Sequence, residues 1–111
     1  MNGYFTAAEA GSYAFYKVPK VLFTDTEYKS VSTDAKMLYG LLLDRMQLSI
    51  KNGWTDNCGR EYQYFTVKQA QKLLGFGHEK ICKLFHELEQ SDLICRKRQG
   101  QGKASIIYLK K

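Results

Sequence analysis

The apolar positions between residues 32 and 52 repeat with the spacing of an α-helix. They form one broad stripe made of Ala35, Leu38, Tyr39, Leu42, Leu43, Met46 and Ile50. Ser32 and Asp34 suit the start of this helix, because a serine oxygen accepts a free backbone N–H and an acid favours the positive end of the helix dipole. The width of the stripe predicts a central, well-covered helix that ends before Asn52-Gly53.

Two more helices are predicted further along the chain. Thr66 and Gln69 have the spacing of a capping box, and they open a helix whose inner face is Val67, Ala70 and Leu74. Gly75-Phe76-Gly77 then breaks the chain. The next helix runs from His78 to about Gln90, and its single narrow apolar stripe consists of Ile81, Leu84, Phe85 and Leu88.

Aromatic and β-branched runs predict two hairpins. The first joins Trp54-Thr55 to residues 61–65 across an Asx/Gly turn at residues 56–59. The second joins a strand at residues 93–98 to a strand at residues 105–109, and its tip contains two glycines and Lys103.

The N-terminal residues carry weaker signals. Residues 1–14 are expected to form a flexible arm, and the aromatic run from Tyr13 to Val18 predicts either an arm or an edge strand, because it ends at Pro19. The pattern from Thr24 to Glu27 matches a capping box and predicts a short helix that reaches about Lys29.

The predicted order is helix, hairpin, helix, short glycine turn, helix, hairpin. A helix-turn-helix followed by a β-hairpin is the plan of a winged helix. We therefore expect an α+β fold, a winged helix (winged helix-turn-helix) with small β-hairpins, over residues 15–111. A chain of 111 residues has the usual length of one domain.

Positive charge is concentrated at the C-terminal end. The formal net charge is +6. Residues 1–79 hold nine Lys and Arg against eight Asp and Glu, whereas residues 80–111 hold eight against three. This asymmetry favours an anionic partner, although a basic surface can also serve only solubility.

The last helix and the hairpin after it together favour binding to double-stranded DNA. A helix with one apolar face can lie in the major groove and present its polar face to the bases, while glycines let a basic hairpin approach a phosphate or the minor groove. The candidate residues of the recognition helix are His78, Glu79, Lys80, Lys83, His86 and Glu87. The candidate residues of the wing are Arg96, Lys97, Arg98, Gln99, Gln101 and Lys103.

Each of these two elements has a simpler explanation when it is taken alone. An amphipathic helix with a solvated face and a basic solvated hairpin are both common. The two glutamates of the helix also repel phosphate, although a carboxylate can accept a hydrogen bond from cytosine. For His86 we expect a partly buried side chain in preference to a contact with a base.

The sequence contains no motif of an enzyme, and neither a cofactor nor a metal is expected. The cysteines, Cys58, Cys82 and Cys95, include no C-x-x-C pair, and there are two histidines. We see neither a secretory signal nor a membrane span, so we expect a cytoplasmic protein with no membrane partner. Binding to RNA or single strands is disfavoured, because Tyr62, Tyr64, Phe65 and Phe85 are expected in the core.

Several runs resemble the RepA N-terminal domain family, the replication initiators of plasmids and related mobile elements of Gram-positive bacteria. The match covers roughly residues 15–110, and the segment 58–76 departs most from the family pattern. The runs that carry the resemblance are residues 15–23, 32–46, 51–54, 96–103 and Ile107-Tyr108.

The resemblance implies a winged helix that binds repeated DNA sites at a replication origin, commonly as a homodimer. It also implies that host replication proteins are engaged by a further C-terminal domain absent from this chain, so we expect the chain to be part of a longer protein. Two other functions stay open. The domain could act as a transcriptional repressor of a mobile element, or as a winged-helix protein-interaction module.

Overall fold

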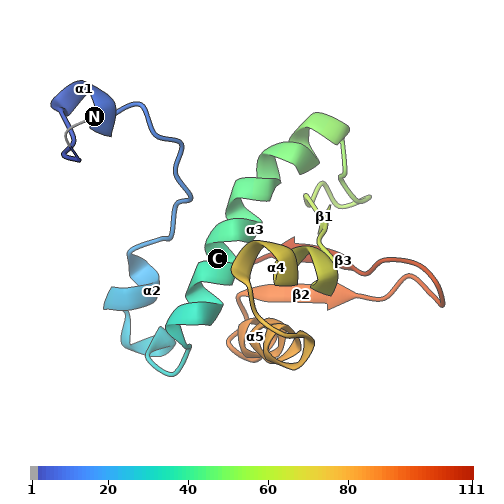
Figure 1. The fold of residues 1–111 in the computed structure, drawn as a ribbon. Coiled ribbons are helices and arrows are strands. Elements are labelled where there is room, and N and C mark those ends of the chain that lie inside the picture. Colours follow the sequence, from blue (N-terminus) through green and yellow to red (C-terminus); the bar gives the residue numbers. More distant parts are fainter. Residues whose placement is uncertain (1–2) are drawn as a thin grey trace.

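A computed structural model describes residues 3–111 of the chain (Figure 1). A long helix α3 crosses the domain, and helices α4 and α5 and a small sheet pack beside it. The elements are α1 (Ala7–Ala10), α2 (Val21–Thr24), the 3-10 helix η1 (Thr26–Tyr28), α3 (Thr33–Asn52), β1 (Gln63–Tyr64), α4 (Val67–Leu74), α5 (His78–Gln90), β2 (Ile94–Lys97) and β3 (Ile106–Leu109).

The sheet has three antiparallel strands in the order β1-β3-β2. Strands β2 and β3 form the expected hairpin, with Arg96 opposite Ile107. Strand β1 pairs with the other edge of β3, with Gln63 also opposite Ile107. The hairpin projects away from the helices, and its tip is at the far right of Figure 1. This arrangement confirms the winged-helix fold predicted from the sequence.

The apolar stripe of α5 lies at the centre of the core. Its four predicted residues are all buried, and Ile81, Phe85 and Leu88 have no exposed surface. They pack with the buried face of α3, which includes Leu38 and Leu42, as one contiguous cluster. Because these side chains fix α5 by close packing, its polar face is presented on a rigid support.

The helix ends follow from local chemistry. The Ser32 hydroxyl accepts the backbone N–H of Ala35 at 3.1 Å, and Gly53 closes α3 in the left-handed conformation with φ of 67°. The helix extends through Asn52, one residue beyond the predicted end. The capping box of Thr66 and Gln69 is present at the start of α4, as predicted.

Gly40 lies where the N-terminal segment crosses α3. A Cβ atom at this position would lie 2.9 Å from Val18 Cγ2, which is closer than real Cβ contacts, and 3.1 Å from the Lys17 carbonyl oxygen, which is tighter than most of them. The absence of a side chain at Gly40 therefore lets the segment rest on the helix. The chain before residue 17 then leaves the body of the domain, as the blue segment of Figure 1 shows.

Some sequence predictions need correction. Thr24 is the last residue of α2 and does not cap a helix; Asp25 caps η1 by accepting the Glu27 N–H at 2.9 Å. The first hairpin is shorter than predicted: one bridge joins Thr55 to Glu61, and residues 63–64 form β1, which pairs with β3. Of the two interpretations of the aromatic run before Pro19, the edge strand is absent, because residues 14–19 form no strand.

Tyr62 and Tyr64 were predicted to lie in the core, and this prediction is wrong. Both lie outside the buried core. They alternate with the buried Gln63, so their rings lie on the outer face of the sheet. There they make edge-to-face contacts with one another and with Trp54, at ring-centre distances of 5.8 and 4.9 Å. Phe65 and Phe85 are buried as predicted.

Candidate nucleic-acid interface

Helix α5 presents five of its six candidate residues to solvent. His78, Glu79, Lys80, Lys83 and His86 are exposed. The expectation that His86 is partly buried is therefore wrong, because the apolar stripe of α5 is narrow and His86 lies on the opposite side. Within residues 3–111, Lys83 and Glu79 form no ion pair or side-chain hydrogen bond, so both are available to a ligand.

Lys80 already has two partners in the free domain. Its Nζ lies 2.8 Å from Oδ2 of Asp34, which belongs to the first turn of α3. The same ammonium group lies 4.2 Å from the centre of the Phe76 ring, in the turn before α5. Its charge is thus partly neutralised and its position is fixed from two sides.

Glu87 links α5 to the start of α3. One carboxylate oxygen accepts the Ser32 backbone N–H at 3.0 Å, and the other accepts the Ser32 hydroxyl at 2.9 Å. Glu87 is only half exposed. Both of its oxygens are engaged within the domain, so the carboxylate holds two helices together; a contact between Glu87 and DNA stays a prediction.

Arg96, at the base of the wing, also has partners inside the domain. Its Nη2 lies 2.6 Å from Oε1 of Glu89, and its guanidinium lies 4.7 Å from the centre of the Phe85 ring. The alternation of side chains along β2 therefore turns Arg96 toward α5. This arginine attaches the wing to the recognition helix.

The next residues of the wing are more open. Lys97 Nζ lies 5.4 Å from the centre of the Tyr108 ring, on the outer face of the sheet. Arg98, Gln99, Gln101 and Lys103 are exposed around the tip. Across the described residues 3–111, neither Arg98 nor Lys103 has an ion-pair partner. These two cations give the tip its available positive charge.

The glycines of the tip have the conformations expected of a flexible turn. Gly100 has φ of 130° and Gly102 has φ of 78°, values that other residues rarely adopt. A Cβ at either position would meet nothing within 4 Å. Glycine is therefore required here by the backbone conformation and not by a lack of room. The space beside both glycines is open.

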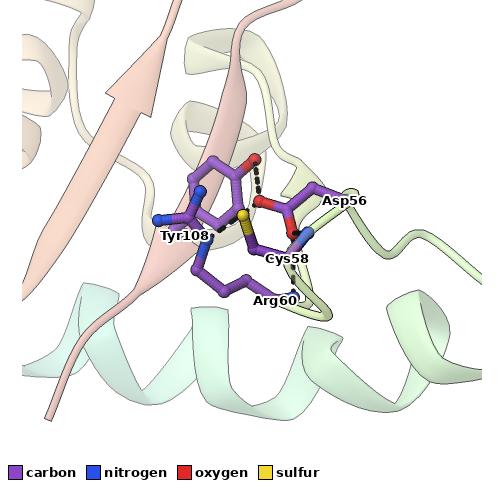
Figure 2. A network of polar contacts seen from close by, with 4 residues as sticks. All are labelled: Asp56, Cys58, Arg60 and Tyr108. Atoms are coloured by element: carbon purple, nitrogen blue, oxygen red, sulfur yellow. Dashed lines mark hydrogen bonds and ion pairs between the residues drawn. The ribbon is translucent and has the colours of Figure 1, made fainter.

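A polar network around Asp56 fixes the other end of the hairpin, and the sequence had suggested only a turn there. Figure 2 shows Asp56 accepting the Tyr108 hydroxyl, at 3.0 Å, and Nε of Arg60, at 2.9 Å. Its other oxygen accepts the backbone N–H groups of Cys58 and Arg60, each at 2.9 Å. These hydrogen bonds, led by the Arg60 N–H, lower the pKa of Asp56 to about 2.

The consequence of this network is that the loop at residues 56–60 is tied to β3. The guanidinium of Arg60 lies 5.3 Å from the centre of the Tyr108 ring, so two residues that are far apart in the sequence are close in space. Burial raises the pKa of Tyr108, and the hydrogen bond to Asp56 adds to this effect. Asp56 and Tyr108 are 52 residues apart, so local sequence patterns do not reveal the contact.

Two polar side chains, the half-buried Arg45 and the buried Gln63, attach β1 to α3. Arg45 donates from Nη2 to the Tyr64 carbonyl oxygen at 2.8 Å, and its guanidinium lies 4.6 Å from the centre of the Phe65 ring. Burial lowers the pKa of this arginine. Gln63 donates from Nε2 to the Leu42 carbonyl oxygen at 2.8 Å. These contacts hold the first strand against the core.

Within residues 3–111 no group of three or more His, Cys, Asp or Glu side chains could hold a metal ion. The three cysteines are unpaired: Cys58 is exposed, and Cys82 and Cys95 are half-buried. No helix in this part of the chain has the length and apolar character to cross a bilayer.

The α4–α5 pair and the basic β2–β3 hairpin define a winged-helix domain. Residues 14–111 match the family model described as replication initiator protein A (RepA) N-terminus, and the chain belongs to this family. The resemblance seen in the sequence is thereby confirmed.

Solved structures are similar over almost the whole chain. One, described as "N-Terminal domain of DNA binding protein", has 40% sequence identity and a TM-score of 0.81, over 100% of this chain and 85% of the other. A second, "Structure of Rep-DNA complex", has 40% identity and a TM-score of 0.81, over 97% and 83%. A third, "Structure of MDR initiator", has 44% identity and a TM-score of 0.79, over 97% and 85%.

A relative from Lactobacillus helveticus, described as "41 kDa protein", is 30% identical over 96 residues. The match covers 86% of this chain and 27% of that protein. The chain therefore spans about a quarter of the length of this relative.

Proposed function

We propose that this domain binds double-stranded DNA at a replication origin, as the N-terminal domain of a replication initiator. Membership of the initiator family supports this proposal, and one structural observation carries it. The exposed face of α5 and the exposed tip of the wing are consecutive in the chain and both carry cations without acidic partners, Lys83 on α5 and Arg98 and Lys103 on the wing.

In this proposal the two elements contact different parts of the duplex. Helix α5 enters the major groove, where Glu79, Lys83 and His86 meet base edges. The wing follows the backbone or the minor groove through Arg98, Gln99, Gln101 and Lys103. Arg96 and Glu87 act mainly by holding the wing and α3 against α5, because their charged groups are engaged there.

The proposal extends to partners. We infer that the domain acts as a homodimer on repeated sites, and the exposed aromatic residues of the N-terminal segment support an assembly role. Tyr13, Phe15 and Tyr16 are 59%, 65% and 51% exposed. Residues 3–14 serve as an arm and residues 15–111 as the binding domain; residues 1 and 2 of the arm predicted from the sequence lie outside the described residues. Host replication proteins would be engaged by another domain of a longer protein.

We also infer that the domain works in the cytoplasm, where its DNA is, and that its own contribution is binding without catalysis. The family description, an initiator N-terminus, supports a binding role. No cofactor is invoked in this role.

The proposal is tested by fluorescence anisotropy with a labelled duplex taken from repeats in the gene that encodes the domain. A shuffled duplex of the same composition is measured beside it over a series of salt concentrations. A specific complex is expected to be about 10³-fold tighter than the shuffled control near physiological salt.

A variant that lacks the two available cations of the wing tests the proposed DNA-binding face. The double substitution Arg98→Ala with Lys103→Ala should weaken binding to every duplex and reduce the slope of log K against log salt by about 2, because each phosphate contact contributes about 0.9. Lys51→Ala with Lys68→Ala removes the same charge from exposed positions outside α5 and the wing. Equal binding by the wing variant and the wild type would reject the proposed face.

Binding to the repeats in a promoter, without binding at the origin, would instead favour the role of transcriptional repressor. A defined oligomer with negligible affinity for any duplex would favour a protein-interaction module.

A further inference from the structure

The surface between the start of α3 and α5 carries more acidic than basic groups, although the domain as a whole is basic. A hollow of about 410 Å³ lies between the start of α3 and α5. Its charged lining consists of Asp34, Glu79, Lys80, Lys83 and Glu87, which is three carboxylates and two ammonium groups. This balance is unexpected for a surface that approaches a polyanion.

Asp34 is the acidic residue that comes from another element. It lies in the first turn of α3, where a carboxylate favours the helix dipole. The N-cap is Ser32, whose hydroxyl accepts the Ala35 N–H, so Asp34 is not needed for capping. Its carboxylate instead lies 2.8 Å from Lys80 Nζ.

This pairing changes what Lys80 can do on DNA. A phosphate contacted by Lys80 would lie close to the Asp34 carboxylate, which is paired with the same ammonium group. The net electrostatic gain is therefore small, because the carboxylate repels the phosphate. A base acceptor carries no formal charge, so this repulsion is absent, and the ammonium group has three donors, of which Asp34 takes one.

The position of Lys80 is also fixed before any DNA arrives. Asp34 and the Phe76 ring hold its ammonium group from two sides. A long side chain that is already ordered loses less rotamer freedom on binding. The ion pair thus favours a contact of Lys80 with one defined point on the DNA over contacts with many positions along the DNA backbone.

We propose that Asp34 is a specificity-determining residue, which suppresses general affinity for the DNA backbone by neutralising Lys80 while holding Lys80 for a contact with a base. This inference rests on the proposed DNA-binding function. It assigns to the first helix of the winged-helix core a part in selecting DNA, although Asp34 lies on neither the recognition helix nor the wing.

The test uses Asp34→Asn and a duplex of random sequence, so the natural site need not be known. Freeing Lys80 should raise affinity for this duplex about three- to fivefold at low salt, the size expected of one exposed charge pair. The slope of log K against log salt should steepen by about 0.9, since Lys80 gains a phosphate contact.

Asp44→Asn is the matched control. It makes the same chemical change on the same helix and alters the net charge equally. Asp44 is exposed and lies ten residues further along α3, which corresponds to about 15 Å along the helix axis. If Asp34→Asn and Asp44→Asn bind the random duplex equally, the effect is one of net charge and the inference is wrong.

A second variant tests whether the effect of Asp34 acts through Lys80. Adding Lys80→Ala to Asp34→Asn should return affinity for the random duplex to the wild-type value, because the freed cation is gone. Lys80→Ala alone should weaken binding to the origin repeat more than binding to the random duplex. An Asp34→Asn gain that survives the loss of Lys80 would overturn the inference.

The two possible failures can be told apart. If the folded wild type binds no duplex, the proposed function itself fails. If the wild type binds and the wing-neutralised variant loses affinity, while Asp34→Asn behaves like Asp44→Asn, only the role of Asp34 is rejected. Circular dichroism and thermal unfolding establish that each variant is folded.

Discussion

Helix α5 and the wing follow one another in the chain, yet they are attached to the domain by different kinds of contact. Helix α5 is held by four buried apolar side chains. The base of the wing combines the buried side chains of Ile94 and Ile107 with two polar contacts, Arg96 on Glu89 and Tyr108 on Asp56. The position of the helix therefore depends on close packing, whereas the wing adds polar contacts at its base, and Arg98 and Lys103 near its tip have no ion-pair partner among residues 3–111.

This difference has a functional meaning. A packed helix keeps its polar face in one place, which suits direct contacts with bases. A hairpin whose tip has no internal ion pairs can adapt to the shape of the backbone, which suits contacts that do not depend on sequence.

The largest effect is expected from Phe85→Ala. The ring is fully buried in the core and also lies under the guanidinium of Arg96. Its loss should destabilise the domain by about 3–5 kcal/mol, the usual cost of such a cavity. The measurement is urea unfolding followed by circular dichroism, with Phe23→Ala, at an exposed position, as the control. A cost below about 1 kcal/mol would show that α5 is not held by packing.

An intermediate effect is expected from Lys83→Ala. Lys83 has no partner among residues 3–111, so its removal should leave stability unchanged. Binding to the origin repeat should weaken by about 1–3 kcal/mol if Lys83 contacts a base, with a relaxed preference at one position. Anisotropy against a set of single-base variants of the repeat measures both. Uniform weakening across all sequences would place Lys83 on a phosphate instead.

The smallest effect concerns pH and the base of the wing. The pKa of Asp56 is about 2 in the folded domain, below its ordinary value of 3.8. A lowered pKa stabilises the folded state fully above the ordinary value, and this contribution is lost as pH falls toward the folded value. The stability difference between wild type and Asp56→Asn should therefore shrink between pH 5 and pH 2.

Urea unfolding of both proteins across this range provides the measurement. Asp44→Asn, at an exposed carboxylate outside the network, is the matched control for the loss of one negative charge. A wild-type advantage over Asp56→Asn that stays constant down to pH 2 would mean that the ionised carboxylate does not hold the loop to β3.

The parts of the fold that the sequence predicted are those governed by local rules. The stripe of α5, the capping box at Thr66 and the β2–β3 hairpin each depend on residues close together in the chain. The order of these elements along the chain then predicted a winged helix, and the family resemblance implied the same fold. The exposed positions of the proposed DNA face could likewise be listed in advance, because they follow from helical periodicity.

The contacts that could not be predicted join residues far apart in the chain. Glu87 with Ser32 and Tyr108 with Asp56 are separated by 55 and 52 positions. Such pairs depend on the packing of α3 against α5 and of the loop at 56–60 against β3. Alternation along β1 also does not reveal which face is covered, so Tyr62 and Tyr64 were assigned to the core although they face outward.

The missing side chain at Gly40 has a mechanical consequence. The N-terminal segment touches α3 at Gly40, and α5 is fastened to the same helix at Ser32. These points of attachment are eight residues apart, about 12 Å along the axis. A load on the arm, such as the pull of a second subunit, is therefore applied to the half of α3 that also bears the recognition helix.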